Sequence, residues 1–152
     1  MNREIEYRGR SLSDDRWVYG YYLVHEAPLA VMGPSDHKDI HYIVETGFAD
    51  WGMERPLTLR EVEPATVGQF TGLKDSKGRR IYERDIVRPS WSETAQPGWV
   101  EFQAPAFVIR HNTKSGATSK GWSTFDLAPD ENQVYEVIGT VHQNPKLLEA
   151  NA

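Results

Sequence analysis

Residues 67–87 read VGQFTGLKDSKGRRIYERDIV, and this stretch decides the fold. Residues 67–73 combine β-branched and aromatic side chains with two glycines, as expected for a strand that packs closely on its neighbours. Residues 74–78 (KDSKG) are turn residues, and Gly78 accepts a positive φ without steric cost. An apolar pair at 81–82 then begins a return strand. The stretch predicts a β-hairpin whose loop ends on glycine.

Three carboxylates lie within and just after this hairpin. Asp75, Glu83 and Asp85 are close enough in sequence to suggest a pair of acid–base catalysts. A structural role is the stronger interpretation, because aspartates in turns accept hydrogen bonds from nearby backbone N–H groups. We therefore expect Asp75 to support the hairpin turn and Asp85 to bond the backbone ahead of the next strand, which Pro89 closes.

Composition narrows the class of protein. The chain has 152 residues, 39% of them hydrophobic, with five Trp and seven Tyr, which is enough for one domain or two small subdomains. Its net charge of −5 provides no global basic field to attract nucleic acid or an anionic membrane. Cysteine is absent, which excludes disulfides and thiol chemistry. No leader peptide or run of membrane-spanning length is evident, so we expect a soluble cytoplasmic protein.

Strand patterns dominate the rest of the chain. Alternation of apolar and polar residues, or short apolar runs bounded by turn residues, predicts strands near 5–7, 17–24, 40–44, 57–62, 99–102, 106–110, 121–127 and 134–142. Helical periodicity is nearly absent, and Asn144-Pro145 predicts one short C-terminal helix. The fold class is therefore mainly β. We expect an N-terminal β-rich subdomain (1–66) and a C-terminal SH3-like barrel with the hairpin (67–152), built as one compact unit.

One strand carries an unusual number of aromatic residues. In residues 17–24, alternation places Trp17, Tyr19 and Tyr21 on one face. These rings suit a platform for stacking bases, with Arg8 and Arg10 near enough to contact phosphates. The interpretation we favour is that the rings fill the core or a subunit interface.

A second group of arginines, consisting of Arg79, Arg80, Arg84 and Arg88, surrounds the hairpin. Such clusters usually form a solvated strand face paired with acidic residues, and Glu83 and Asp85 lie close by. The weak binding candidates from both groups are Arg8, Arg10, Trp17, Tyr19, Tyr21, Arg80 and Arg84.

Evidence for a metal, cofactor or catalytic site is weak. Residues 36–41 (DHKDIH), with His25 upstream, have an H-x-x-x-H spacing that places both imidazoles on one face only in a helix. A Gly-Pro pair precedes them and a strand pattern follows, so a surface loop is expected. The chain lacks a G-x-S-x-G nucleophile motif and a phosphate-binding glycine loop. We expect no metal, no cofactor and no enzymatic activity.

Three ordered blocks resemble the YopX family, small proteins found widely in bacteriophages and prophages. Residues 68–75 (GQFTGLKD) and 81–87 (IYERDIV) are similar to the family's central signature. Residues 8–10 with 17–21 resemble its opening block, and residues 135–145 (YEVIGTVHQNP) its closing block. One departure is visible, since Arg84 replaces the family's glycine. If that position has a positive φ, the arginine costs on the order of 1 kcal/mol.

The resemblance implies a β-rich fold with a C-terminal SH3-like barrel and self-association, but no molecular function. We expect a phage or prophage accessory protein in the cytoplasm of a bacterial host, acting as a non-catalytic, homo-oligomeric module that binds an unidentified host or phage protein. The alternative is a nucleic-acid-binding accessory protein of phage replication or transcription. A basic patch favours this alternative, whereas a largely apolar exposed patch favours protein binding.

Overall fold

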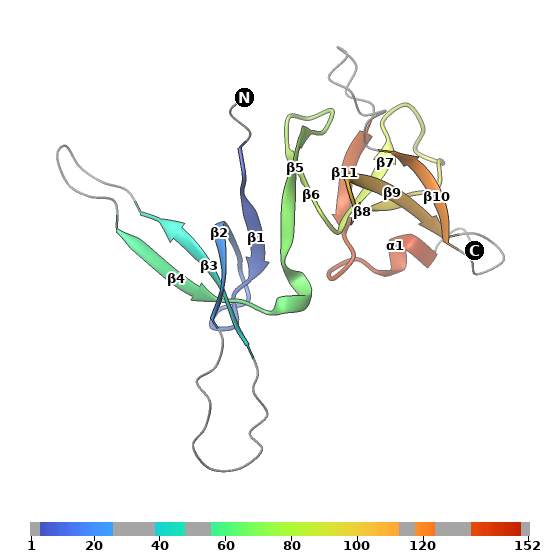
Figure 1. Cartoon of the computed structure of the whole chain (residues 1–152). Coiled ribbons are helices and arrows are strands. Elements are labelled where there is room, and N and C mark those ends of the chain that lie inside the picture. The colour runs from blue at the N-terminus through green and yellow to red at the C-terminus, as the bar shows by residue number, and fades with distance from the viewer. Residues whose placement is uncertain (1–3, 26–38, 48–55, 113–117, 124–134, 150–152) are drawn as a thin grey trace. The chain divides into compact units, whose positions relative to one another are not determined.

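The computed structural model describes residues 4–25, 39–47, 56–112, 118–123 and 135–149 (Figure 1). The described residues are mainly β, as predicted, and form two antiparallel sheets, one 3₁₀ turn and one short C-terminal helix. Its contacts divide it into two units. One contains residues 5–69, and the other contains residues 1–4 and 70–152, whereas the expected boundary followed residue 66.

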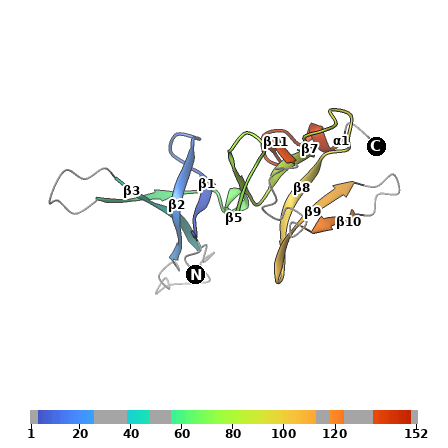
Figure 2. The same ribbon diagram turned by 90° about the horizontal axis from the view of Figure 1, so that it is seen from above.

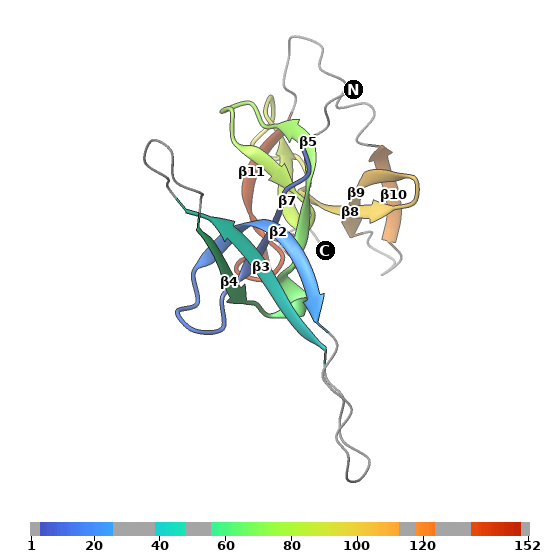
Figure 3. The same ribbon diagram turned by 60° about the vertical axis from the view of Figure 1, so that its left-hand side comes forward.

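The N-terminal unit is an antiparallel sheet. Its elements are β1 (Tyr7–Arg10), β2 (Trp17–His25), β3 (Ile40–Thr46), β4 (Leu57–Glu61), the 3₁₀ turn η1 (Pro64–Thr66) and the beginning of β5 (Gly68–Lys74). The strands follow the order β4-β3-β2-β1-β5. Figure 3 shows β2, β3 and β4 side by side.

One face of this sheet forms the core of the unit. Val18 on β2, Ile43 on β3 and Val62 are fully buried, and Tyr7, Tyr22 and Val67 pack against them. Gly20 allows the backbones of β2 and β3 to approach, because a Cβ atom there would lie 2.1 Å from the carbonyl oxygen of Val44.

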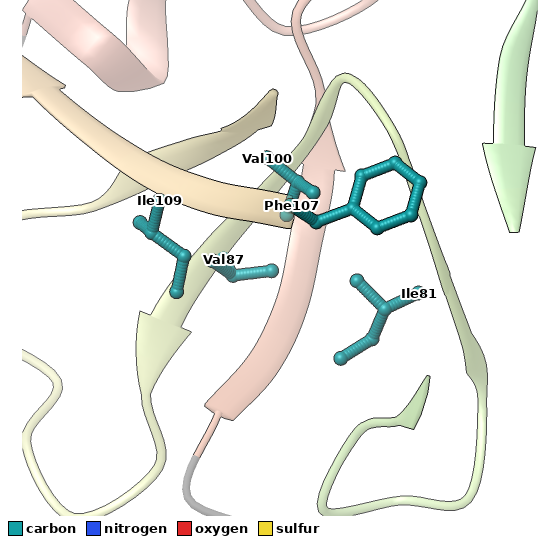
Figure 4. Close-up of a cluster of buried hydrophobic side chains, with 5 residues drawn as sticks. All are labelled: Ile81, Val87, Val100, Phe107 and Ile109. Carbon is teal, nitrogen blue, oxygen red and sulfur yellow. The ribbon is translucent and has the colours of Figure 1, made fainter. Parts of the chain in front are cut away.

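The C-terminal unit contains the hairpin and a second sheet. The rest of β5 pairs with β6 (Arg80–Tyr82). The sheet contains β7 (Asp85–Pro89), β8 (Gly98–Gln103), β9 (Ala106–Asn112), β10 (Thr118–Ser123) and β11 (Tyr135–Thr140), and the helix α1 (Lys146–Glu149) follows. Figure 2 shows β8, β9 and β10 along one side of the unit. The buried cluster is Ile81, Val87, Val100, Phe107 and Ile109 (Figure 4).

The expected SH3-like barrel is not confirmed. The strand order of the second sheet is β10-β9-β8-β7-β11, and within the described residues its two edge strands do not pair with each other. The sheet is therefore open. Counting five short strands predicted their number, but closure depends on strand tilt and register, which a strand count does not contain.

Candidate protein-binding face

Asp75 has a structural position rather than a catalytic one. Its carboxylate is fully buried, and Oδ1 accepts hydrogen bonds from the backbone N–H groups of Lys77 at 2.9 Å and Arg79 at 2.8 Å. Oδ2 accepts from Arg79 Nε at 2.8 Å and from the Val137 N–H at 3.2 Å. Burial opposes ionisation, but these hydrogen bonds outweigh it and hold the pKa of Asp75 below its ordinary value. The predicted role in the turn is confirmed.

Asp85 acts on the backbone of the next turn. It is also fully buried, and its Oδ2 accepts a hydrogen bond from the Tyr82 N–H at 2.8 Å. Arg84 between them has φ = 68°, and its N–H donates to the Val100 carbonyl at 2.7 Å. The two aspartates therefore hold turns in place, and neither is exposed to a substrate.

The N-terminal sheet has a second face, opposite its core. Residues alternate between the two faces of a strand, so the residues next to Val18 and Ile43 point away from the core. The apolar and aromatic residues on this side, which we call the open face, are Trp17, Tyr19, Tyr21, Leu23, Ile40, Tyr42, Val44, Leu57 and Leu59.

Much of the open face is exposed. The exposed fractions are 61% for Tyr21, 46% for Tyr19, 45% for Leu23, 64% for Leu57 and 52% for Leu59. Single exposed apolar side chains are common, but a contiguous group of them marks an interaction surface. Tyr19 and Tyr21 therefore do not fill the core, and that part of the prediction is wrong. Alternation alone could not tell which face of β2 is covered.

The strand register makes the open face continuous. Tyr21 lies opposite Val44, and Val44 lies opposite Leu59, so an apolar row crosses three strands. Leu23 lies opposite Tyr42 in the next row. Directly opposed side chains on one face of a sheet are in contact range. The face is thus an apolar surface rather than scattered apolar residues.

Arg8 and Arg10 border the open face on β1. They lie opposite Tyr19 and Trp17, so the structure brings five of the seven binding candidates together. Arg8 is only 7% exposed, and its guanidinium stacks 4.6 Å from the centre of the Trp17 ring. Arg10 forms an ion pair with Asp15 and donates to the Asp15 carbonyl at 2.9 Å. Both arginines thus interact with residues of their own unit.

Arg80 and Arg84 belong to the C-terminal unit. Arg80 forms a 2.6 Å ion pair with Glu4, and its guanidinium lies 5.2 Å from the centre of the Phe70 ring. Arg84 is held by its backbone, as described above. Arg79 forms a 2.8 Å ion pair with Asp75. Arg79 and Arg80 are thus paired with acidic side chains, as expected from the sequence, and their partners are Asp75 and Glu4.

The histidines form no metal site among the described residues, in which no cluster of three or more metal-ligating side chains occurs. His41 lies on β3, and its Nδ1 is 2.5 Å from the Tyr22 hydroxyl. Burial, assisted by nearby Tyr7, raises the pKa of Tyr22 above its ordinary value. Asp36 and His37 of the suggested cluster lie outside the described residues.

None of the helices described is long and apolar enough to cross a bilayer.

Sequence reasoning did not select Leu57 and Leu59 as site residues. Their alternation predicted the strand at 57–62, and it also placed the two leucines on one face. That face could be identified as part of a surface only once the register joined Leu59 to Val44 and Tyr21.

The fold defines a two-unit antiparallel β protein with an exposed apolar sheet face. The chain belongs to the YopX family, because the family model described as "YopX protein" matches residues 7–149, nearly the whole chain. Among solved structures, it is similar to protein EF1440 from Enterococcus faecalis, with 16% sequence identity and a TM-score of 0.49. That match covers 97% of this chain and 99% of EF1440. No curated protein matches the chain.

Proposed function

We propose that this chain is a non-catalytic protein-binding module that self-associates, with the open face of its N-terminal sheet as a contact surface. The observation that carries the proposal is the exposed apolar row of Tyr21, Val44 and Leu59. Burying such a row lowers the free energy by roughly 25 cal/mol per Å² of apolar surface removed from water. Tyrosine is also enriched at protein interfaces, because it combines a large apolar ring with a hydroxyl group that can be hydrated.

The family resemblance supports a role as an accessory protein of a phage or prophage, acting in the bacterial cytoplasm. The partner of such a module is then a host or phage protein, in addition to further copies of the chain.

The alternative function is nucleic-acid binding through the same aromatic face. Tyr19 and Tyr21 are exposed enough to stack on bases, which favours this alternative. The arginines beside them do not favour it, because Arg8 is buried against Trp17 and Arg10 is paired with Asp15. Phosphate contacts provide most of the affinity of non-specific nucleic-acid binding, so the protein-binding function is supported better.

Fluorescence anisotropy with labelled single- and double-stranded DNA and RNA distinguishes the two functions. The protein-binding function predicts no binding even at low salt. Binding that weakens steeply as salt increases, and that is lost in Tyr21→Ala, would establish the nucleic-acid function instead. Glu61→Gln is a matched control. Glu61 lies on the same side of the sheet, opposite Tyr42, and removing its charge should not weaken the binding of an anionic ligand.

A further inference from the structure

Strand β4 is the terminal strand of its sheet among the described strands. The Val62 N–H donates to the His41 carbonyl on β3 at 2.9 Å, whereas the Glu61 carbonyl accepts from the Leu12 N–H on the other side at 3.0 Å. Backbone groups of successive residues in an antiparallel strand point to opposite sides. The N–H and C=O groups of Leu57 and Leu59 therefore point away from β3, in the same direction as those of Glu61.

This edge lacks the devices that usually prevent strand addition. Natural edge strands are commonly protected by lysine, proline or a β-bulge. Residues 57–61 (LTLRE) contain neither lysine nor proline, and their register with β3 runs without interruption. The charged residues lie at the far end of the strand, and Arg60 is held by Glu45 at 3.1 Å. The first half of β4 is accordingly suited to pairing with another strand.

We propose that two copies of the chain pair through this edge, antiparallel, with Thr58 on the two-fold axis. In this register Leu57 faces the partner's Leu59, and Leu59 faces the partner's Leu57. Each of these pairs exchanges two N–H···O bonds, and the four leucines gather on the open face. The inference rests on the proposed function, because it specifies where the copies that self-associate meet.

Charge and hydrogen bonding favour this register over two others. A parallel, in-register pair places Arg60 beside the partner's Arg60 and Glu61 beside the partner's Glu61, and directly opposed like charges are destabilising. An antiparallel pair centred on Leu59 sets Glu61 against the partner's Leu57, but the Glu61 carbonyl already accepts from Leu12. The register centred on Thr58 avoids both conflicts.

The pairing also enlarges the proposed contact surface. It joins the two sheets edge to edge, so that their open faces form one continuous face. Leu57 and Leu59 of both copies lie at its centre, and the Tyr21 row extends outward on each side. A further protein would then meet an apolar surface twice as wide as the face of one copy.

Cysteine cross-linking tests the register, because the natural chain contains no cysteine. Thr58→Cys places two thiols at a non-hydrogen-bonded pair with Cα atoms about 4.5 Å apart, within the range for a disulfide. Mild oxidation should therefore produce a covalent dimer that reductant reverses. The matched control is Thr46→Cys on β3. In the proposed dimer the two copies of this exposed position lie three strand spacings, roughly 14 Å, apart, so oxidation should give no covalent dimer.

Two further variants complete the test. Mixing Leu57→Cys chains with Leu59→Cys chains should give a covalent dimer containing one chain of each kind. Leu59→Lys should abolish self-association of the full chain while its circular dichroism spectrum is retained. If the natural chain self-associates but Thr58→Cys cross-links no more than Thr46→Cys, the pairing through β4 is wrong and the proposed function stands. If the natural chain is monomeric at every concentration, self-association itself is wrong.

Discussion

The Asp75 carboxylate accepts a hydrogen bond from the backbone N–H of Val137, 62 residues further along the chain, at 3.2 Å. The same residue organises its own turn, because its other oxygen accepts from Lys77 and Arg79. One buried side chain thus connects the hairpin turn to β11. The Ser76 N–H adds a bond to the Tyr135 carbonyl at 2.8 Å, which fixes the same junction.

Asp75→Asn should lower the free energy of unfolding by about 2–3 kcal/mol. An amide has one acceptor oxygen where the carboxylate has two, so buried N–H groups lose their charged acceptor. Urea denaturation measures this change. Glu136→Gln is the control, since it removes a surface ion pair with Lys77 and should change the free energy by less than about 1 kcal/mol. Equal effects of the two variants would show that Asp75 does not hold the junction.

Stability should also fall in acid. The pKa of Asp75 is lowered in the folded chain, so the unfolded chain binds more protons as the pH decreases. The contribution of Asp75 is fully present above its unfolded pKa of about 3.9 and is lost as the pH falls through its lower folded value. Denaturation measured from about pH 5 downward should show a smaller loss of stability for Asp75→Asn than for the natural chain. Parallel curves for the two chains would contradict this role.

Gly20→Ala should be far more damaging than Gly72→Ala. Both glycines have positive φ, 156° and 90°, but an added Cβ meets the Val44 carbonyl oxygen at 2.1 Å only at Gly20. At Gly72 nothing lies within 4 Å, so the cost there is conformational and about 1 kcal/mol. Thermal unfolding followed by tryptophan fluorescence compares the two. Similar melting temperatures would show that β2 and β3 do not approach this closely.

Arg84→Gly should stabilise the fold. Arg84 has φ = 68°, a conformation that costs a side-chain-bearing residue on the order of 1 kcal/mol. Glycine removes this cost but gains freedom in the unfolded chain, so the net gain is about 0.5 kcal/mol. Arg84→Ala retains the Cβ atom and separates the backbone effect from loss of the guanidinium. A glycine variant no more stable than the alanine variant would contradict the interpretation.

The sequence predicted the features that depend on local backbone chemistry. Gly78 has the positive φ that its turn required, and Asp75 bonds the backbone as its place in the turn indicated. Alternation also assigned the residues of the strand at 17–24 to the correct faces, since Val18 is buried and Tyr19 lies on the other face. These properties follow from a residue and its near neighbours, and so a short pattern contains them.

Properties that depend on distant strands were not predictable in this way. Whether Tyr21 is covered depends on what packs over its face of the sheet, and the local pattern is the same for a buried strand. That Tyr21 lies in one row with Leu59 follows only from the register of β2 with β3 and of β3 with β4. The barrel was inferred from the number of strands. Among the described residues, however, β10 and β11 are the two edge strands of the sheet and do not pair with each other.

We propose that the chain self-associates through apolar surface and not through charge. Multi-angle light scattering across a wide range of protein concentration, at low and at high salt, measures this association. We predict a molar mass that increases with concentration toward that of a dimer, and an association that is kept or strengthened at high salt because each chain carries a net charge of −5. A monomer at every concentration and both salt levels would show that the chain does not self-associate.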